Sequence, residues 1–306
     1  LKNVVVACQT HGTLNEKKDN AVLIFHALSG SAHIAGFNSS FASQNSFWTE
    51  DCHKGWWDDY VGAGKVIDTG KNFVICQNIL GGCYGTTGPS SVNQETNEQY
   101  GSSFPDIEIE DIVRLQKEVL EKLGIKKLKC VMGGSMGGYN VLEYLLHFGD
   151  EVEKAIIIGS AARASSLNKL MGFEQIIAIE NDPHFNRGNY YGRTTPDKGL
   201  MLARMVAAKT YVDIETIALR AKEEVVLPND YFYDYRLRHN LESYVFHQVQ
   251  KFVKRFDANT YLKIVKALQN FDLARKYGNG VLANALSGLR QNKTKYRVVT
   301  IDSDVC

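Results

Sequence analysis

The sequence contains no apolar run long enough to cross a membrane and no surplus of either charge. No stretch approaches the roughly 18 consecutive apolar residues of a membrane-spanning helix, so we expect no membrane partner. The 35 Lys and Arg residues nearly balance 34 Asp and Glu residues, and no long run of one sign stands out. The net charge of +1 gives no reason to expect a nucleic-acid partner.

Paired cysteine spacings are also absent. The chain has six cysteines, none in a CxxC arrangement, and Cys76 and Cys130 lie within apolar runs. Buried single thiols of this kind behave as small core residues. The pattern predicts no disulfide framework and favours the reducing cytoplasm as the location.

Five short segments are apolar along nearly their whole length. Continuous rather than alternating hydrophobicity is typical of parallel strands that are covered on both faces. Helical patterns follow at residues 110–125 and directly after Ser135. The order of strand and helix predicts an α/β fold, with a mostly parallel sheet flanked by helices. The five predicted strands are 21–28, 73–80, 128–134, 155–161 and 296–303.

Residues 166–290 interrupt this rhythm. The stretches LMLARMVAAKTYV and LESYVFHQVQKFVKRF have helical patterns, and no strong strand separates them. We therefore predict a first core segment at 1–165, a helical insertion at 166–290, and a last core strand at 291–306. An insertion at this point can form a lid over the carboxyl edge of the sheet, where open α/β sheets bind ligands.

The most informative motif is Gly133-Gly134-Ser135-Met136-Gly137, which matches G-x-S-x-G. A predicted strand precedes it and a predicted helix follows it, which is the context this motif requires. In such a sharp turn the serine backbone is strained, and neighbouring residues must lack side chains. The motif predicts that Ser135 is a catalytic nucleophile. The alternative is a glycine-rich turn in which the serine only caps the helix.

A serine nucleophile needs two backbone N–H donors for the negative oxygen of its intermediate. The residue after the serine, Met136, supplies one donor in this motif. The junction HALSGSAH at 26–33 follows the first predicted strand, and we take the Leu28 N–H as the second donor. His26 and His33 in this junction have no common zinc-ligand spacing, so we predict no metal site. A glycine-rich stretch at 82–89 is predicted to be a turn that lines the pocket near Ser135.

Four stretches together resemble one enzyme family, the homoserine O-acetyltransferases. They are NAVLIFHALSGSAHIAG (20–36), GWWDDYVGAGKVIDTGKNFVICQNILGGCYGTTGPSS (55–91), GGSMGG (133–138) and RFDANTYL (255–262). The resemblance implies an α/β-hydrolase fold and a homodimer. It also implies no bound cofactor, with acetyl-CoA as co-substrate. The implied reaction is a ping-pong transfer, in which acetyl-CoA acylates Ser135 and L-homoserine then takes the acetyl group, a step of methionine biosynthesis.

The resemblance also assigns roles to individual residues. Ser135 matches the nucleophile, and Leu28 and Met136 match the oxyanion donors. Arg204 and Tyr211 match residues that hold homoserine, and a guanidinium is well suited to grip a carboxylate. For Arg204 the alternative is a structural ion pair. Asp304 matches the acidic residue of the catalytic triad, with Asp302 as its rival.

The triad also implies a histidine after Asp304, because this fold orders its triad Ser, Asp, His. None of the eight histidines follows Asp304; His26 and His247 do not match the family's position. We therefore expect the chain to be incomplete at both ends. These 306 residues alone should be poorly stable and nearly inactive, since loss of a triad member costs about 10⁶ in turnover. The alternative is a naturally inactive relative.

Other activities on the same scaffold stay open from the sequence. The acyl donor could be succinyl-CoA, and the acceptor serine or a larger alcohol, because the nucleophile motif is common to such enzymes. Water could be the acceptor, which would make the protein an esterase. A non-catalytic binding protein is the fourth interpretation.

Overall fold

The computed structural model describes residues 1–306 except 222–231, 233, 291–292, 303 and 305–306. Its strands are β1 (Cys8–His11), β2 (Ala21–Phe25), β3 (Val61–Gly62), β4 (Ile67–Asp68), β5 (Phe73–Gln77), β6 (Val92–Asn93), β7 (Glu98–Gln99), β8 (Cys130–Gly134), β9 (Lys154–Ile158) and β10 (Lys295–Val299). Its α-helices are α1 (Ile109–Lys122), α2 (Met136–Phe148), α3 (Ser166–Glu180), α4 (Asp197–Tyr211), α5 (Ile214–Arg220), α6 (Asn240–Lys254), α7 (Ala258–Asn270), α8 (Leu273–Tyr277) and α9 (Leu282–Ser287).

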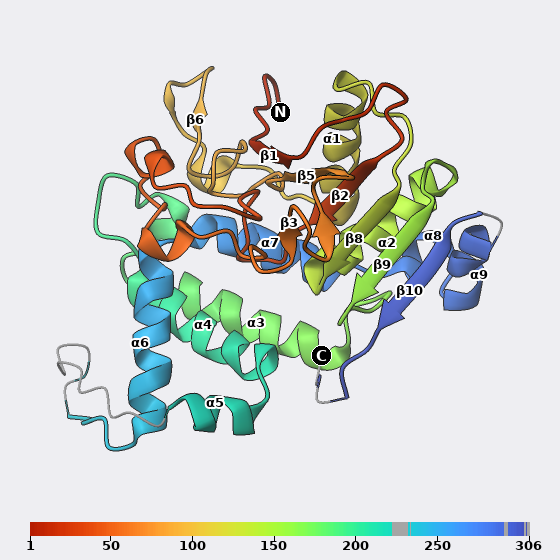
Figure 1. Cartoon of the computed structure of the whole chain (residues 1–306). Coiled ribbons are helices and arrows are strands. Elements are labelled where there is room, and N and C mark those ends of the chain that lie inside the picture. Colours follow the sequence, from red (N-terminus) through yellow and green to blue (C-terminus); the bar gives the residue numbers. More distant parts are fainter. Residues whose placement is uncertain (222–231, 233, 291–292, 303, 305–306) are drawn as a thin grey trace.

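Six strands form the central sheet in the order β1-β5-β2-β8-β9-β10 (Figure 1). β1 runs antiparallel to β5, and every other neighbouring pair is parallel. Five of these strands coincide with the five predicted apolar runs. β1 was not predicted, and β10 ends at Val299 rather than at 303.

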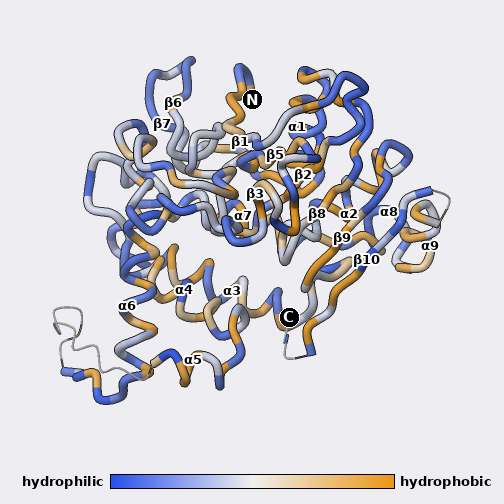
Figure 2. The backbone as a smooth tube through the Cα atoms, viewed as in Figure 1, coloured by the Kyte–Doolittle hydropathy of each residue, from blue (hydrophilic) through white to orange (hydrophobic). Residues whose placement is uncertain are grey.

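The continuous hydrophobicity of the central strands has a direct structural cause, whereas β10 is exposed along its whole length, so the expected cover on both faces is absent there in the described residues. Alternate residues of β2 enter two different clusters: Leu23 packs in the large core with α1 and α2, and Ile24 packs in a smaller core on the opposite face. The smaller core is closed by Ile34 and Val61 from the segment between β2 and β5. Both faces are therefore buried, and no polar alternation is needed. Figure 2 shows the resulting band of hydrophobic residues along the central strands.

All the helices from α3 to α9 lie between β9 and β10 in the chain. α3, α4 and α6 lie beyond the carboxyl ends of the parallel strands, on the lower side of Figure 1. α8 instead lies beside the core helices, since Lys276 and Tyr277 both hydrogen bond to Glu143 of α2. Within the described residues, no helix is long and apolar enough to span a membrane.

Candidate active site

Ser135 occupies a strained position between β8 and α2. Its backbone has φ 54° and ψ −124°, a conformation that residues with a side chain rarely adopt. Two hydrogen bonds hold this turn: Ser135 N–H donates to Ile158 O at 2.9 Å, and Gly138 N–H donates to Ser135 O at 2.9 Å. The serine side chain is exposed although the residues on either side are largely buried. A strained residue fixed in this way is typical of a functional position.

The surrounding glycines are required by close backbone contacts. A Cβ atom on Gly133 would lie 2.4 Å from the carbonyl carbon of Gly137, and one on Gly137 would lie 2.3 Å from Phe25 O. A Cβ on Gly138 would lie 2.5 Å from the Ser160 side chain. Gly134 differs, because its Cβ would have its nearest contact at 3.7 Å. Three of the four glycines therefore allow α2 to pack closely against β2, β8 and the chain after β9.

A cavity of about 680 Å³ opens above Ser135. Its floor contains the carboxyl ends of the strands, including Phe25 and Ile158, and its walls come from α3, α4 and α7. Met171 and Leu268 are examples of the apolar residues from these helices. A largely apolar chamber around an exposed serine can hold a carbonyl compound and limit its contact with water.

The predicted oxyanion donors both border this cavity. Leu28 and Met136 are lining residues, and Met136 is the first residue of α2, so its N–H has no acceptor within the helix. The Leu28 loop is held by His26, which is fully buried. His26 Nδ1 donates to Ala27 O at 2.7 Å, and its Nε2 accepts from Ile79 N–H at 3.3 Å.

These contacts link the end of β2 to the residues after β5 and occupy both ring nitrogens of His26. Burial lowers the pKa of His26 to about 4, which keeps the ring neutral. The ring therefore supports the loop and has no nitrogen left to activate Ser135. His33 is similarly engaged, with Gln9 and with His53 O, so the two histidines do not face a common metal.

Asp304 borders the same cavity as Ser135. Its carboxylate approaches the turn after β9, where Oδ2 lies 3.6 Å from the position of a Cβ on Gly159. Its rival Asp302 is exposed and does not line the cavity. Among the residues that the structure describes, no histidine lines the cavity either.

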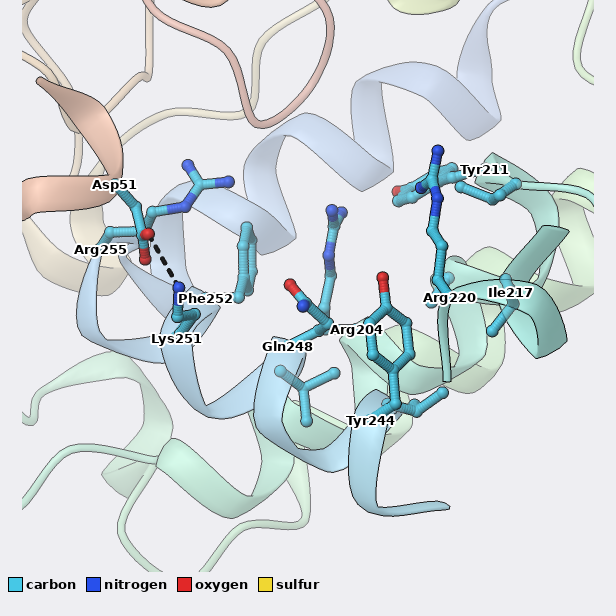
Figure 3. Close-up of a pocket in the computed structure, with 14 residues that line it drawn as sticks. Asp51, Arg204, Tyr211, Ile217, Arg220, Tyr244, Gln248, Lys251, Phe252 and Arg255 are labelled. Atoms are coloured by element: carbon cyan, nitrogen blue, oxygen red, sulfur yellow. Dashed lines mark hydrogen bonds and ion pairs between the residues drawn. The ribbon is translucent and has the colours of Figure 1, made fainter. Parts of the chain in front are cut away.

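Tyr211 borders this cavity, but Arg204 lines an adjoining one of about 360 Å³ (Figure 3). The Arg204 guanidinium lies 4.6 Å from the ring centre of Tyr211 and 4.4 Å from that of Phe252. Its Nη1 is buried and has no hydrogen-bond partner within the described part of the chain. Stacking on two rings fixes the plane of a guanidinium while leaving its edge available for an anion. The Arg204 side chain also interacts with the Tyr261 hydroxyl, and no ion pair joins it to a carboxylate of the described residues.

The glycine-rich stretch 82–89 forms the predicted turn, but it does not line the Ser135 cavity, so its predicted place at the pocket was wrong. It lies instead on the far side of Leu28, where Gly82 and Tyr84 border a small hollow. The stretch is held there because Tyr84 O accepts from Asn78 Nδ2, and Tyr84 OH donates to Arg255 O at 2.5 Å. Its glycines serve a tight turn behind the oxyanion loop.

One buried network was missed by the sequence analysis. Asp257, 1% exposed, accepts from Tyr190 OH at 2.6 Å, from Tyr191 OH at 3.0 Å and from Thr260 N–H at 2.8 Å. Burial is the main cause that raises the pKa of this carboxyl. The network joins the start of α7 to the loop before α4. Asp257 lies within RFDANTYL, but nothing local in the sequence indicates its two tyrosine partners.

A metal site finds little support in the described residues. Glu110, Glu143 and His147 come within ligand distance of one another. The Lys276 ammonium already lies among them, 2.6 Å from Glu110 and 3.3 Å from Glu143. This cluster is an ion-pair network between helices, far along α2 from Ser135.

Comparison with known proteins agrees with this geometry. A family model described as the alpha/beta hydrolase fold matches residues 20–270. A homoserine O-acetyltransferase of Deferribacter desulfuricans is 43% identical over 279 residues, which cover 91% of this chain and 71% of that protein. The chain belongs to the homoserine O-acetyltransferase family. A second member, from Methanobrevibacter ruminantium, is 43% identical over 308 residues and 99% of this chain. This chain spans 59% of that relative's length.

Solved structures include both transferases and esterases. The homoserine O-acetyltransferase of Bacillus anthracis is 26% identical with a TM-score of 0.81, covering 97% of this chain and 86% of that one. Esterase E22 is 27% identical with a TM-score of 0.81, covering 98% of this chain and 89% of that one. The α/β-hydrolase fold predicted for this member of the homoserine O-acetyltransferase family is therefore confirmed.

Proposed function

We propose that this protein transfers an acetyl group from acetyl-CoA to the hydroxyl of L-homoserine through an acetyl-Ser135 intermediate, as a step of methionine biosynthesis. The observation that carries the proposal is the strained, exposed Ser135 beneath a 680 Å³ cavity in a chain of this family.

In the first half-reaction, Ser135 Oγ attacks the thioester carbonyl carbon of acetyl-CoA. The new carbon–oxygen bond forms as negative charge gathers on the carbonyl oxygen, which accepts hydrogen bonds from the N–H groups of Leu28 and Met136. The carbon–sulfur bond then breaks, and the serine proton passes through a general base to the departing thiolate. In the proposal this base is the family's histidine, oriented by Asp304.

In the second half-reaction, the homoserine hydroxyl attacks the acetyl carbon and Ser135 Oγ regains a proton. Arg204 binds the acceptor's carboxylate, and the Tyr211 hydroxyl donates a further hydrogen bond. The proposal is supported by the buried, unpartnered Nη1 of Arg204 and by the position of Tyr211 on both cavities. A guanidinium held between two rings is already oriented before the acceptor arrives.

The intermediate provides the direct test. After the full-length protein is mixed with acetyl-CoA, the peptide that contains Ser135 should gain the mass of one acetyl group. The variant Ser135→Ala should gain none. An acetyl group on another residue, or equal turnover in the variant, would refute the assignment; absence of labelling and turnover would instead support the non-catalytic interpretation.

The acceptor role of Arg204 is tested by separating the two half-reactions. Arg204→Ala should slow transfer to homoserine by an amount equivalent to about 2–5 kcal/mol, while acetylation of Ser135 changes much less. Arg193→Ala, at an exposed site outside both cavities, is the matched control. Equal damage to both half-reactions would indicate a structural role instead.

Substrate choice within the family is a separate question. Acetyl-CoA and succinyl-CoA should be compared as donors, with homoserine and serine as acceptors. We expect the pair of acetyl-CoA and homoserine to give the highest kcat/KM. A preference for succinyl-CoA or serine would keep the Ser135 mechanism and change the substrates.

Ester hydrolysis is the second candidate function, favoured by the similarity to esterase E22. A transferase must let a bound alcohol react faster than water, which requires a covered pocket. We propose that the helices of residues 166–290 act as this cover, because α3, α4 and α7 supply cavity walls. If the protein hydrolyses simple esters rapidly, and added homoserine neither slows this hydrolysis nor receives the acyl group, ester hydrolysis is the favoured function.

We further propose a cytoplasmic homodimer. The outer side of α3 exposes Leu167, Leu170, Phe173 and Ile177, with Leu170 and Phe173 more than half exposed. Such an apolar row supports contact with a second copy. Leu170→Glu should shift the molar mass measured by light scattering towards that of a monomer, whereas Val92→Glu on β6 should not. The five described cysteines are all free thiols, which suits the cytoplasm.

A further inference from the structure

The cavity that contains Arg204 carries far more positive charge than the proposed acceptor needs. Among the described residues, its lining includes the cationic residues Arg204, Arg220, Lys251 and Arg255 and one acidic residue, Asp51, so these lining residues sum to a charge of +3. Homoserine is a zwitterion with a single carboxylate, and one guanidinium can bind that group. A concave site with this surplus concentrates anions of higher charge.

The four cations differ in how far they are already engaged. Arg255 Nη1 donates to Ser29 O and to Tyr84 OH, both at 3.2 Å, and Lys251 pairs with Asp51 at 3.1 Å. Arg220, at the end of α5, is exposed, and its side chain forms no hydrogen bond or ion pair with a described residue. In Figure 3 the Arg220 and Arg204 side chains extend in the same direction, and Tyr211 lines the same cavity.

The two cavities share a wall. Tyr211 and Val212 border both the Ser135 cavity and the basic cavity. This arrangement suits a molecule whose reactive group and charged group are separated by a long uncharged arm. Acetyl-CoA is such a molecule, since a flexible arm links its thioester to a diphosphate and a 3′-phosphate.

We propose that the basic cavity binds the phosphate groups of the acyl donor, with Arg220 as their principal partner and Lys251 as a second. This inference rests on the proposed function for the identity of the donor. The phosphates bind through charge-assisted hydrogen bonds, which planar guanidinium groups favour. Arg204, stacked between two rings at the shared wall, remains for the acceptor's carboxylate.

Binding of a phosphate probe tests the cavity without any turnover. Calorimetry should measure the affinity of adenosine 3′,5′-bisphosphate for the unaltered protein, for Arg220→Gln and for Arg193→Gln, which removes the same charge outside both cavities. We expect Arg220→Gln to weaken binding by about 10- to 100-fold, and Arg193→Gln to change it by less than twofold. Equal affinities in all three proteins, or no binding by the unaltered protein, would overturn the proposal.

Kinetics of the full-length protein then separate the donor from the acceptor. The ratio of kcat/KM for acetyl-CoA to that for S-acetylpantetheine, which lacks phosphates, should fall at least tenfold in Arg220→Gln and in Lys251→Gln. An unchanged ratio would refute the proposal while leaving acetyl transfer intact. A rise in KM for homoserine alone would assign Arg220 to the acceptor. If acetyl-CoA does not acetylate Ser135, the proposed function fails, and bisphosphate binding still reports on the cavity.

Discussion

The strained backbone of Ser135 predicts that the nucleophile lowers the stability of the protein. Ser135→Gly and Ser135→Ala both remove the hydroxyl, but only glycine adopts φ 54°, ψ −124° without strain. Strain of this kind costs about 1–3 kcal/mol. Glycine is also more flexible in the unfolded chain, which lowers the stability of the glycine variant by about 0.5–1 kcal/mol and offsets part of the relieved strain. Ser135→Gly should therefore be more stable than Ser135→Ala by about 0.5–2 kcal/mol.

Thermal unfolding can resolve this difference. The unfolding entropy is about 2.1 cal/mol/K per residue. For a chain of this length, the stability difference therefore corresponds to a Tm for Ser135→Gly that is higher than that of Ser135→Ala by about 1–3 °C. Ser243, buried inside α6, provides the control because glycine in a helix is less stable than alanine there by about 1 kcal/mol. The order of the glycine and alanine variants should thus reverse between the two positions. If Ser135→Gly unfolds at a lower Tm than Ser135→Ala, as expected at Ser243, the turn at Ser135 stores no strain and the reasoning is refuted.

Three further predictions concern close backbone contacts and buried titratable groups. Gly137→Ala, whose Cβ would lie 2.3 Å from Phe25 O, should lower the unfolding free energy in urea by about 1–3 kcal/mol, whereas Gly134→Ala should change it by less than about 0.5 kcal/mol. The pKa of His26 is about 4 in the folded protein and near 6.5 when unfolded, so the unfolded chain binds the extra proton. Stability measured by denaturation should fall by up to about 3 kcal/mol from pH 6.5 to pH 4, and His26→Gln should flatten this change; an equal slope in the variant would contradict it. Asp257→Asn should cost about 1–3 kcal/mol and speed proteolysis of residues 166–290; an unchanged digestion pattern would argue against its linking role.

The parts of the fold that could be predicted are those with a local signal. β2, β5 and β8 are buried on both faces, and β9 is buried on one face and half-buried on the other, so their apolar runs are continuous and easily recognised. The glycines around Ser135 identify the strand-to-helix turn for a similarly local reason. β1 was missed because its residues alternate between exposed and half-buried positions over only four residues.

The supporting residues of the site carry no such signal. His26 holds the oxyanion loop through Ile79, which is 53 residues away, and Asp257 binds tyrosines 66 and 67 residues away. Their roles depend on tertiary contacts that no periodicity or short motif records. The glycine-rich stretch 82–89 shows the reverse case, where a conspicuous motif serves a turn behind the site.

The distance in sequence between Asp257 and its partners also bears on how the protein is made. Synthesis proceeds at about 5–20 residues per second, so roughly 10 s separates the appearance of Ser135 from that of α7. Until Asp257 binds Tyr190 and Tyr191, the start of α7 is not fastened to the loop before α4. During that interval the apolar cavity walls are incomplete on the ribosome. The growing chain therefore exposes these apolar cavity walls for a limited period. During that period a chaperone that recognises apolar surface can bind to them.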